Sequence, residues 1–301
     1  MSNTTTMNIF TPPPETEYNV LSLGAGVQSS ALALMAAHGE ITPTPDFAVF
    51  ADVGAEPTEV YEWLETLREL INAAPHPFPV HVVKHGDLEE ATMEVQISKG
   101  KGSKPEGAEY LLSIIPMFGR MPNGDVVGAI GRKCTADYKI KPIHKFIKDL
   151  CKIKRGQKEA TVTQWIGISW DEIQRAKDSR VKWCYHRHPL LETKINRAQC
   201  IDWMLKHDYP MPPRSACYFC PFHDNNEWRR MRDDDPVHFQ KAIDFDKKLR
   251  QKFIDHDKFM KMKVYLHRSC KPLDEIDFDN DEDKGQQVWD FNAECEGMCG
   301  V

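Results

Sequence analysis

A segment rich in glycine and serine has the composition of a phosphate-binding turn. In residues 19–40, NVLSLGAGVQSSALALMAAHGE, Gly24 and Gly26 separate a short apolar run from a helical pattern that begins at Ser29 and Ser30. Glycine lets the backbone bend sharply and approach a ligand closely. A helix N-terminus adds unpaired N–H groups and the positive end of the helix dipole. The segment therefore predicts an anion site, with an ordinary serine-capped turn as the alternative.

Cysteines form the second group with chemical potential. The chain has nine, and Cys217 and Cys220 form a CxxC pair. In a large intracellular chain, cysteines more often bind metal or react than form a disulfide framework. Cys151 and Cys200 lie in apolar helical surroundings, where we expect them to act as small hydrophobic residues.

Length and composition predict a globular protein. The 301 residues are 41% hydrophobic, enough for one large domain or two small ones. No apolar run approaches the roughly 20 residues that cross a bilayer. The N-terminus also lacks the pattern of a secretory signal. We therefore expect a cytoplasmic protein without a membrane partner, and a disordered segment over residues 1–17.

Charge is unevenly distributed along the chain. The net charge of −6 argues against bulk electrostatic binding of nucleic acid. Residues 132–158, however, carry ten Lys or Arg against two Asp, whereas residues 274–283 carry seven acids and no base. The basic stretch is suited to a polyphosphate or an RNA backbone. It also fits the solvated face of an amphipathic helix with its apolar stripe at Ile143, Phe146, Ile147 and Leu150.

Alternating strand and helix patterns indicate the fold class. A buried strand over residues 46–54 contains Asp52 near its end, a helix follows, and residues 79–86 predict a third strand. This alternation predicts an α/β fold with a doubly wound, mainly parallel sheet. Ligands of such sheets bind beyond the carboxyl ends of the strands, where the glycine turn and Asp52 both fall.

The chain divides by composition near residue 200. We expect a nucleotide-binding α/β domain over residues 18–200 and a smaller, helical, cysteine-bearing region with a mobile tail over residues 201–301. Residues 99–123 are rich in Gly, Lys and Pro, which predicts a mobile loop or an insertion. A later strand runs into Asp171 and Glu172, and Arg175 follows them.

Several blocks of the sequence together resemble one superfamily, the PP-loop ATP pyrophosphatases and phosphoadenylyl-sulfate (PAPS) reductases. The segment from Gly24 to Ser29 is similar to the family's SGGxDS loop. The other similar blocks are FADVGAEPTEVYEWLETL, GRKCTADYKIKPIHKFI, IGISWDEIQRAK, HPLLE and SACYFCPFHDNNEW. The resemblance implies a PP-loop (HUP-type) α/β domain of the adenine nucleotide alpha hydrolase-like kind, which binds ATP or adenylyl sulfate with Mg²⁺.

The resemblance also implies a set of nucleotide-binding residues. Backbone N–H groups of the turn would hold phosphate oxygens, Asp52 would take the adenosine side or Mg²⁺, and three cations would balance the phosphate charge. Asp171 and Arg175 are the catalytic candidates beside the nucleotide, with a capped helix N-terminus as the alternative. The nucleotide-binding set is Ser22, Gly24, Ala25, Gly26, Gln28, Ser29, Ser30, Asp52, Arg132, Lys133 and Lys139.

Two departures from the family loop favour binding over hydrolysis. The middle glycine is Ala25, which still keeps a small side chain beside the phosphate. The acid before the serine is Gln28, and an amide removes a charge that could contact Mg²⁺ or the attacking group.

The cysteine pattern is similar to that of the iron–sulfur adenylyl-sulfate reductases. Cys134 precedes the CxxC pair with 82 intervening residues, but the family's cysteine pair reads Cys134-Thr135 here, so one ligand is missing. The resemblance implies a [4Fe–4S] cluster on Cys134, Cys217 and Cys220, and Cys184 and the tail cysteines Cys295 and Cys299 are candidates for the fourth ligand. Zinc is the alternative, with Cys184 or His223 completing a tetrahedral site. Unmetallated thiols are the third interpretation.

The C-terminal segment NAECEGMCGV is similar to the mobile Glu-Cys-Gly segment of the same reductases. The resemblance implies that Cys295 is a nucleophile that attacks a nucleotide's sulfonate. Cys299 would then resolve the bond, with a thiol reductant as partner. A frayed end with incidental cysteines is the alternative.

Together these patterns predict a PAPS-reductase-like PP-loop enzyme with sulfur-related or adenylylation chemistry. Its acceptor would be a nucleic acid or a small molecule. One alternative is a non-catalytic, metal-stabilised module that binds a nucleotide or a nucleic acid. Another is a zinc-bearing ATP pyrophosphatase that modifies a nucleic-acid base.

Overall fold

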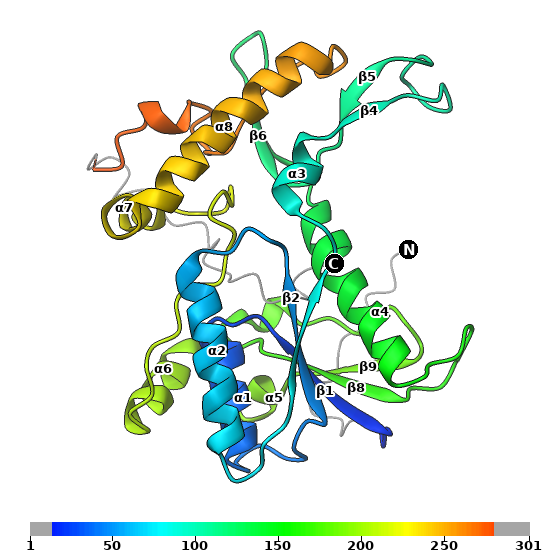
Figure 1. The fold of residues 1–301 in the computed structure, drawn as a ribbon, viewed down its shortest axis with the longest axis vertical. Coiled ribbons are helices and arrows are strands. Elements are labelled where there is room, and N and C mark those ends of the chain that lie inside the picture. The colour runs from blue at the N-terminus through cyan, green and yellow to red at the C-terminus, as the bar shows by residue number, and fades with distance from the viewer. Residues whose placement is uncertain (1–13, 280–301) are drawn as a thin grey trace.

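A five-stranded parallel sheet forms the lower part of the molecule in Figure 1. The structure is a computed structural model, and it describes residues 14–279. The strand order is β3-β2-β1-β8-β9. The strands are β1 (Tyr18–Leu23), β2 (Phe47–Asp52), β3 (Val80–Lys84), β8 (Val162–Ile166) and β9 (Cys184–Arg187).

The chain changes direction across the sheet at β1. Val20 of β1 pairs with Phe47 of β2 on one side and with Gln164 of β8 on the other. The chain therefore proceeds outward from β1 to β2 and β3, and later returns on the other side of β1 with β8 and β9. The carboxyl end of β1 is thus the point where the strand order reverses, the usual ligand position in open parallel sheets.

Helices cover both faces of the sheet. On one face α1 (Val27–Ala37), α2 (Thr58–Ala73) and α6 (Arg197–Lys206) share a core with Leu21, Phe50 and Trp165 of the strands. On the other face α4 (Lys141–Leu150) packs Ile143 and Ile147 against Val20, Val49 and Val162. A parallel sheet buried on both faces explains the nearly continuous apolar runs of β1 and β2. These layers confirm the predicted α/β class with a mainly parallel sheet.

A second core lies in the upper part of Figure 1. Its buried residues come from two stretches of chain, 53–117 and 218–278. β6 is flanked by β10 and β7 in an antiparallel sheet, and β4 pairs with β5 as a hairpin. The elements are α3 (Leu88–Met93), β4 (Val95–Ile97), β5 (Glu109–Leu111), β6 (Met117–Arg120), β7 (Val126–Ile130), α7 (Asn225–Asp234), α8 (Pro236–His256), β10 (Lys263–Tyr265) and η3 (Leu273–Glu275).

This second core differs from the predicted organisation in two ways. It combines residues from both sides of the expected boundary near residue 200, because the segment after β3 packs against α8 instead of returning to the sheet. The stretch 99–123, expected as a mobile loop or an insertion, contains β5 and β6. Backbone pairing with β4, β7 and β10 orders this stretch, and its Gly, Lys and Pro residues fall largely in the turns between strands.

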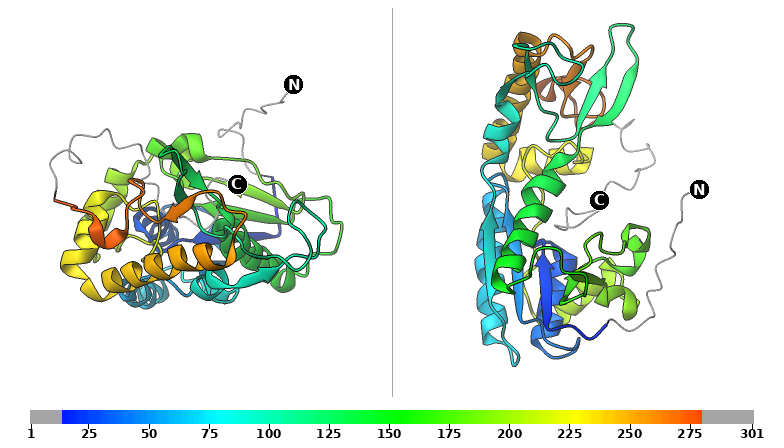
Figure 2. Two further views of the ribbon diagram at one scale, coloured as in Figure 1. Left: turned by 90° about the horizontal axis from the view of Figure 1, so that it is seen from above. Right: turned by 90° about the vertical axis from the view of Figure 1, so that its right-hand side faces the viewer.

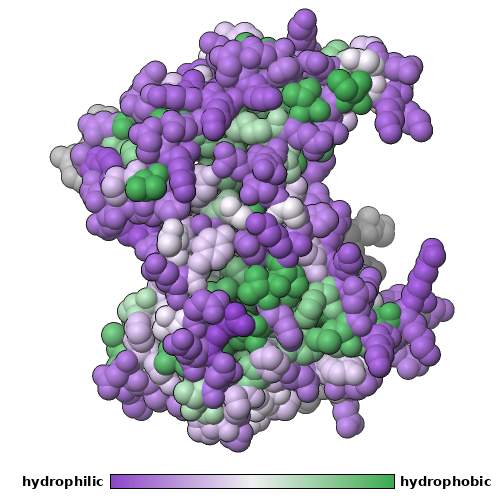
Figure 3. Space-filling view, viewed as in Figure 1, coloured by the Kyte–Doolittle hydropathy of each residue, from purple (hydrophilic) through white to green (hydrophobic). Residues whose placement is uncertain are grey.

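A continuous helical segment connects the two parts. η1 (Thr135–Ile140) leads directly into α4, and Figure 2 shows this segment from the side, between the upper and lower parts. The space-filling view in Figure 3 shows an indentation between the two parts on the face of Figure 1. Two short helices, η2 (Trp170–Arg175) and α5 (Pro189–Glu192), lie near the sheet after β8 and β9. Within residues 14–279, every helix is too short or too polar to cross a membrane.

Candidate functional site

The glycine turn lies where the strand order reverses. α1 begins at Val27, and its N-cap Gly26 has an extended backbone and no side-chain capping bond. The first N–H groups of a helix have no partner within the helix, so they face the edge of the sheet. Ala25 adopts φ +61°, the left-handed conformation that normally belongs to glycine. The turn thus keeps a glycine-like backbone although its middle residue is alanine.

The serine hydroxyls brace the turn. Ser29 Oγ accepts a hydrogen bond from Gly24 N at 3.2 Å and donates one to Gly26 O at 3.3 Å. Ser30 Oγ accepts from Trp63 Nε1 at 2.9 Å. These contacts fix the turn to its own helix and to α2. Within the turn, backbone N–H groups are therefore better placed than the Ser29 hydroxyl to bind a phosphate.

Ser22, the other predicted serine, lies on the face of β1 that packs against α4. Its Oγ accepts from Gln164 Nε2 at 2.6 Å, and only 2% of the residue is exposed. Ser22 therefore links β1 to β8 next to the turn.

Gln28 joins three elements at the edge of the sheet. It is 1% exposed, and its Nε2 donates to Ser169 Oγ at 3.4 Å and to Glu172 Oε2 at 3.2 Å. Its Oε1 accepts from Arg197 NH1 at 2.8 Å. Both ends of the amide are thus in use, and an acid at this position would bring a second carboxylate to Glu172.

Two of the three predicted catalytic residues, Asp171 and Arg175, lie on η2, beside Gln28. Asp171 Oδ1 accepts from the backbone N of Arg197 at 3.1 Å, which stabilises the start of α6. Arg175 forms an ion pair with Glu172 at 2.5 Å. Their catalytic role stays a prediction, and the sequence did not indicate that Glu172 and Arg197 are the direct partners of Gln28.

Asp52 ends β2 at the same edge of the sheet as the turn. Its Oδ1 accepts from Gly54 N at 2.7 Å and from Tyr61 OH at 2.8 Å. Burial, followed by the hydrogen bond and negative charge of Asp52, raises the pKa of Tyr61. Lys84 Nζ lies 3.9 Å from Asp52 Oδ2. Asp52 is therefore a fixed acceptor on the β2 side of the turn.

The three predicted cations lie with the cysteines. The Arg132 guanidinium lies 5.4 Å from the centre of the Phe222 ring. Lys133 N donates to Ile114 O at 2.8 Å. Lys139 is 7% exposed, and its Nζ lies 3.6 Å from Glu56 Oε1. Glu56 follows Asp52 in the chain and was not predicted, although an acid two residues after Gly54 at a strand end is a signal that could have found it.

Cys134, Cys217 and Cys220 come together beside this ion pair. Burial raises the pKa of the Cys217 thiol well above its ordinary value of 9.0, and Glu56 and the thiols of Cys220 and Cys134 add to the rise while Lys139 opposes it. Residues 14–279 contain no group of three or more His, Cys, Asp or Glu side chains spaced to hold a metal ion. Metal binding by the three thiols therefore needs a rearrangement of these side chains.

Of the candidates for a fourth ligand, Cys184 and His223 lie within the described residues, and they differ in position. Cys184 Sγ lies 3.4 Å from Gln164 Oε1, and burial raises its pKa to about 12. It packs with α4 in the sheet core, whereas Cys134 and Cys217 pack against the second core. His223 N donates to Cys220 O at 3.1 Å, and both its ring nitrogens are buried without a hydrogen-bond partner. His223 is thus the better placed of the two.

Cys295 and Cys299 lie outside the described residues, so their predicted chemistry stays a prediction. Cys151 and Cys200 are 6% and 0% exposed within apolar clusters. Their predicted packing role is confirmed.

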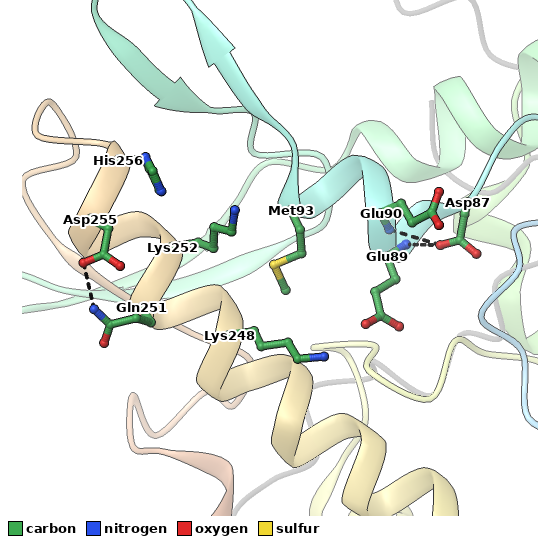
Figure 4. A pocket seen from close by; sticks show the side chains of 9 residues that line it. All are labelled: Asp87, Glu89, Glu90, Met93, Lys248, Gln251, Lys252, Asp255 and His256. Carbon is green, nitrogen blue, oxygen red and sulfur yellow. Dashed lines mark hydrogen bonds between the residues drawn. The ribbon is translucent and has the colours of Figure 1, made fainter.

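Two larger hollows lie in the upper part of the molecule. One of about 690 Å³ lies between α3 and α8, and Figure 4 shows Asp87, Glu89 and Glu90 on the α3 side and Lys248 and Lys252 on α8. Asp87 caps α3 by accepting from Glu89 N at 2.9 Å. The other, of about 780 Å³, lies between the β6–β7 hairpin and the end of α8. Mixed charge around these open hollows favours no particular ligand.

Neither a scan against protein-family models nor a search of the curated proteins finds a match to this chain. The structure itself supports an α/β, Rossmann-like arrangement, a parallel sheet with helices on both faces. Function must therefore be argued from the site.

Proposed function

We propose that this chain is a PAPS-reductase-like PP-loop enzyme that binds ATP or adenylyl sulfate and carries out sulfur-related or adenylylation chemistry. The position of the glycine turn carries this proposal. It lies at the N-terminus of α1 and at the carboxyl end of β1, where the strand order reverses. Both features favour phosphate binding.

The surroundings of the turn support an adenine nucleotide in one orientation. With phosphates at the turn, Asp52 on the neighbouring strand would accept hydrogen bonds from the ribose or ligate Mg²⁺ through water. Asp171 and Arg175 lie on the other side of the turn, after β8. There they would face the group that reacts at the α-phosphate.

In the adenylylation reaction, an acceptor oxygen forms a bond to the α-phosphorus and the bond to the bridging oxygen breaks. Pyrophosphate leaves with that electron pair, and the acceptor proton passes to a base such as Asp171. Backbone N–H groups of the turn would stabilise the charge on the leaving pyrophosphate.

The thiol cluster supports sulfur-related chemistry. Cys217 has a raised pKa, so its thiol is protonated at neutral pH and is a weak nucleophile. A metal ion displaces such a proton, so a ligand role suits Cys217 better than attack on a substrate. We propose an iron–sulfur cluster on Cys134, Cys217 and Cys220, with zinc as the alternative. A bound cluster would supply electron transfer or an open iron for sulfur binding.

Binding calorimetry with ATP and with adenylyl sulfate tests the turn. A valine strongly disfavours the left-handed backbone of Ala25. We expect micromolar binding of one nucleotide by the wild type and a loss of roughly tenfold or more in Ala25→Val. Ala73→Val, an exposed site at the end of α2, serves as the control and should bind normally. Failure of the wild type to bind either nucleotide at millimolar concentration would refute the proposal.

Anaerobic purification with iron, sulfide and zinc analysis tests the cluster. We expect iron and sulfide in the wild type and their loss in Cys217→Ser. Zinc without iron would select the zinc-bearing alternative. Metal-free protein that still binds nucleotide would remove the cluster from the proposal and leave the turn intact.

A nucleotide-binding module without turnover is the second candidate, and the contacts of Gln28 favour it. The amide replaces the acid of the family loop and is held by Ser169, Glu172 and Arg197. Release of pyrophosphate or AMP in the presence of an acceptor separates the two. Binding without any such release would select the module.

A further inference from the structure

Three histidines border a small cavity near the carboxyl ends of β8 and β9. They are His144 of α4, His186 of β9 and His188 directly after β9, and the cavity measures about 70 Å³. His186 is 9% exposed and His188 is 2% exposed. The Nε2 atom of each of the three rings is buried without a hydrogen-bond partner. Buried polar atoms are nearly always paired, so three such atoms around one cavity point to a bound polar group.

The charges around the cavity favour an anion. Arg175, Lys177 and Arg180 line it, against a single acid, Asp178. Arg175 shares its charge with Glu172, whereas Lys177 and Arg180 lie on the exposed rim. The remaining wall is apolar, with Ile140, Ile166 and Ile168. Apolar walls reduce screening, so the cations act strongly on a group inside.

The size of the cavity limits the guest. At roughly 30 Å³ of liquid volume for each water, the cavity offers the space of about two waters. That space suits one tetrahedral oxyanion and is too small for a nucleoside. Metal binding by the imidazoles is not favoured, because residues 14–279 contain no suitably spaced group of three such ligands.

The hydrogen-bonding pattern distinguishes between oxyanions. His186 Nδ1 donates to the carbonyl oxygen of Lys177 at 2.9 Å. In the neutral ring its Nε2 is therefore an acceptor, whereas Nε2 of His144 and of His188 can carry a hydrogen and donate. Burial lowers the pKa of His188 to about 3 and that of His144 to about 4, so these rings are neutral at physiological pH. Two donors and one acceptor match hydrogen phosphate, which has one O–H group, better than sulfate, which has none.

We propose that this cavity binds a phosphate group in its hydrogen phosphate form, either free inorganic phosphate or the terminal phosphate of a larger molecule. The site is distinct from the Gly24 turn, although Gly167, which lies in the chain between the lining residues Ile166 and Ile168, packs against Ser29: a Cβ on Gly167 would lie 3.1 Å from Ser29 Cα. The proposed phosphate site depends only on the residues around this cavity and does not require the proposed nucleotide chemistry.

Calorimetry with inorganic phosphate on the full-length protein tests this inference. We expect submillimolar binding of phosphate at about pH 7.5 and binding of sulfate that is roughly tenfold weaker or less. His188→Gln removes one ring nitrogen. Arg180→Gln removes an exposed cation, so it should not disturb folding. Each should weaken phosphate binding by about tenfold. His76→Gln, an exposed histidine before β3 at the opposite edge of the sheet, is the control and should bind as the wild type does.

Titration with ATP in the presence of phosphate shows whether the bound group is free phosphate or the terminal phosphate of a nucleotide. If the terminal phosphate of a nucleotide is the natural guest, ATP competes with phosphate and binds less tightly to His188→Gln. If free phosphate is the guest, the protein binds both together and His188→Gln leaves ATP affinity unchanged. Either result supports the site.

Four results would overturn the proposed phosphate site. The wild type could fail to bind phosphate at millimolar concentration, or it could bind sulfate equally well. Phosphate affinity could be unchanged in both His188→Gln and Arg180→Gln, or the site could bind Zn²⁺ tightly and lose it in His188→Gln. If the wild type binds ATP but not phosphate, this site alone is refuted. If the wild type binds phosphate but neither ATP nor adenylyl sulfate, the nucleotide proposal alone is refuted.

Discussion

Nε2 of Gln28 donates a hydrogen bond to Oε2 of Glu172 at 3.2 Å, which joins the first turn of α1 to η2. Arg197 contacts the other end of the same amide at 2.8 Å. An amide can donate to a carboxylate and accept from a guanidinium at once. Gln28 is therefore matched to its neighbours in this chain.

Gln28→Glu should destabilise the protein. The change removes the donor to Glu172 and Ser169 and buries a second carboxylate, a loss of roughly 1–3 kcal/mol in the free energy of unfolding at neutral pH. Two crowded carboxylates repel each other, which favours protonation of one of them, so the repulsive part of the loss should shrink as pH falls. Urea unfolding at about pH 5 and about pH 8 measures this.

Gln174→Glu is the matched control for that change, because Gln174 is exposed on the same short helix. Its free energy of unfolding should change by no more than about 0.5 kcal/mol. An unchanged stability of Gln28→Glu at high pH would contradict the pairing of Gln28 with Glu172.

Lys139→Met should destabilise the protein more at high pH than at low pH. Burial raises the pKa of Glu56 above its ordinary value of 4.5, and Lys139 opposes the rise. Without Lys139 that pKa rises further. At low pH, Glu56 of the variant is then neutral in both the folded and the unfolded state. The loss in free energy of unfolding grows as pH rises from the pKa of Glu56 in the unfolded chain to its higher pKa in the folded chain. We expect a loss of roughly 3–5 kcal/mol at about pH 8.

Two further variants sharpen this test. Lys141→Met removes an exposed lysine from the next turn and should change stability by about 0.5 kcal/mol or less. Glu56→Gln combined with Lys139→Met should cost less than the sum of the single changes, because neither charge is left buried alone. Strict additivity would show that Glu56 and Lys139 do not interact.

Ala25→Gly should stabilise the protein by about 0.5–1 kcal/mol. Alanine at φ +61° has a left-handed backbone, which costs about 1–2 kcal/mol. Glycine removes this cost but loses about 0.5–1 kcal/mol because its backbone gives up more entropy on folding. The difference is the expected gain in stability. Ala74, at φ −78°, has no such strain, so Ala74→Gly should instead lose stability. Thermal unfolding compares the two, and equal losses in both variants would argue against a left-handed Ala25.

Most of the sheet was predictable because β1, β2, β3 and β8 are short, largely apolar runs separated by helical patterns, whereas β9, with the sequence CYHR, has no such signal. Val20 and Leu21 of β1, for example, are both fully buried, one on each face. The second core was not predictable in the same way. Its helix α8 packs on a segment more than a hundred residues earlier, such as Leu111, and neither local periodicity nor composition indicates which distant segments pair.

Part of the candidate site was predictable because its residues can be recognised by their type and their position in the sequence. The turn, Asp52 and the thiols of Cys134 and Cys217 were all marked by residue type and by position after a strand or in a motif. His188 was missed because its burial and its unpartnered Nε2 appear only in the folded structure, whereas Glu56 had a sequence signal, its position after a strand end, but its burial appears only in the fold.

Cys217 should react slowly with alkylating reagents in the metal-free native protein. Burial first, then Glu56, raises the pKa of this thiol well above 9.0, and the thiolate is the reactive form. At about pH 7.5 we expect iodoacetamide to modify Cys217 at least about tenfold more slowly in the native chain than in the same chain in urea. Peptide mass spectrometry gives both rates.

Glu56→Gln separates charge from mere inaccessibility at Cys217. Removing the Glu56 carboxylate takes away one cause of the raised pKa, so alkylation of native Glu56→Gln should be faster than that of the native wild type. If the two native rates are equal, limited access alone protects the thiol. If native and unfolded wild type react equally fast, Cys217 is an ordinary reactive thiol, and the argument that it acts as a ligand and not as a nucleophile fails.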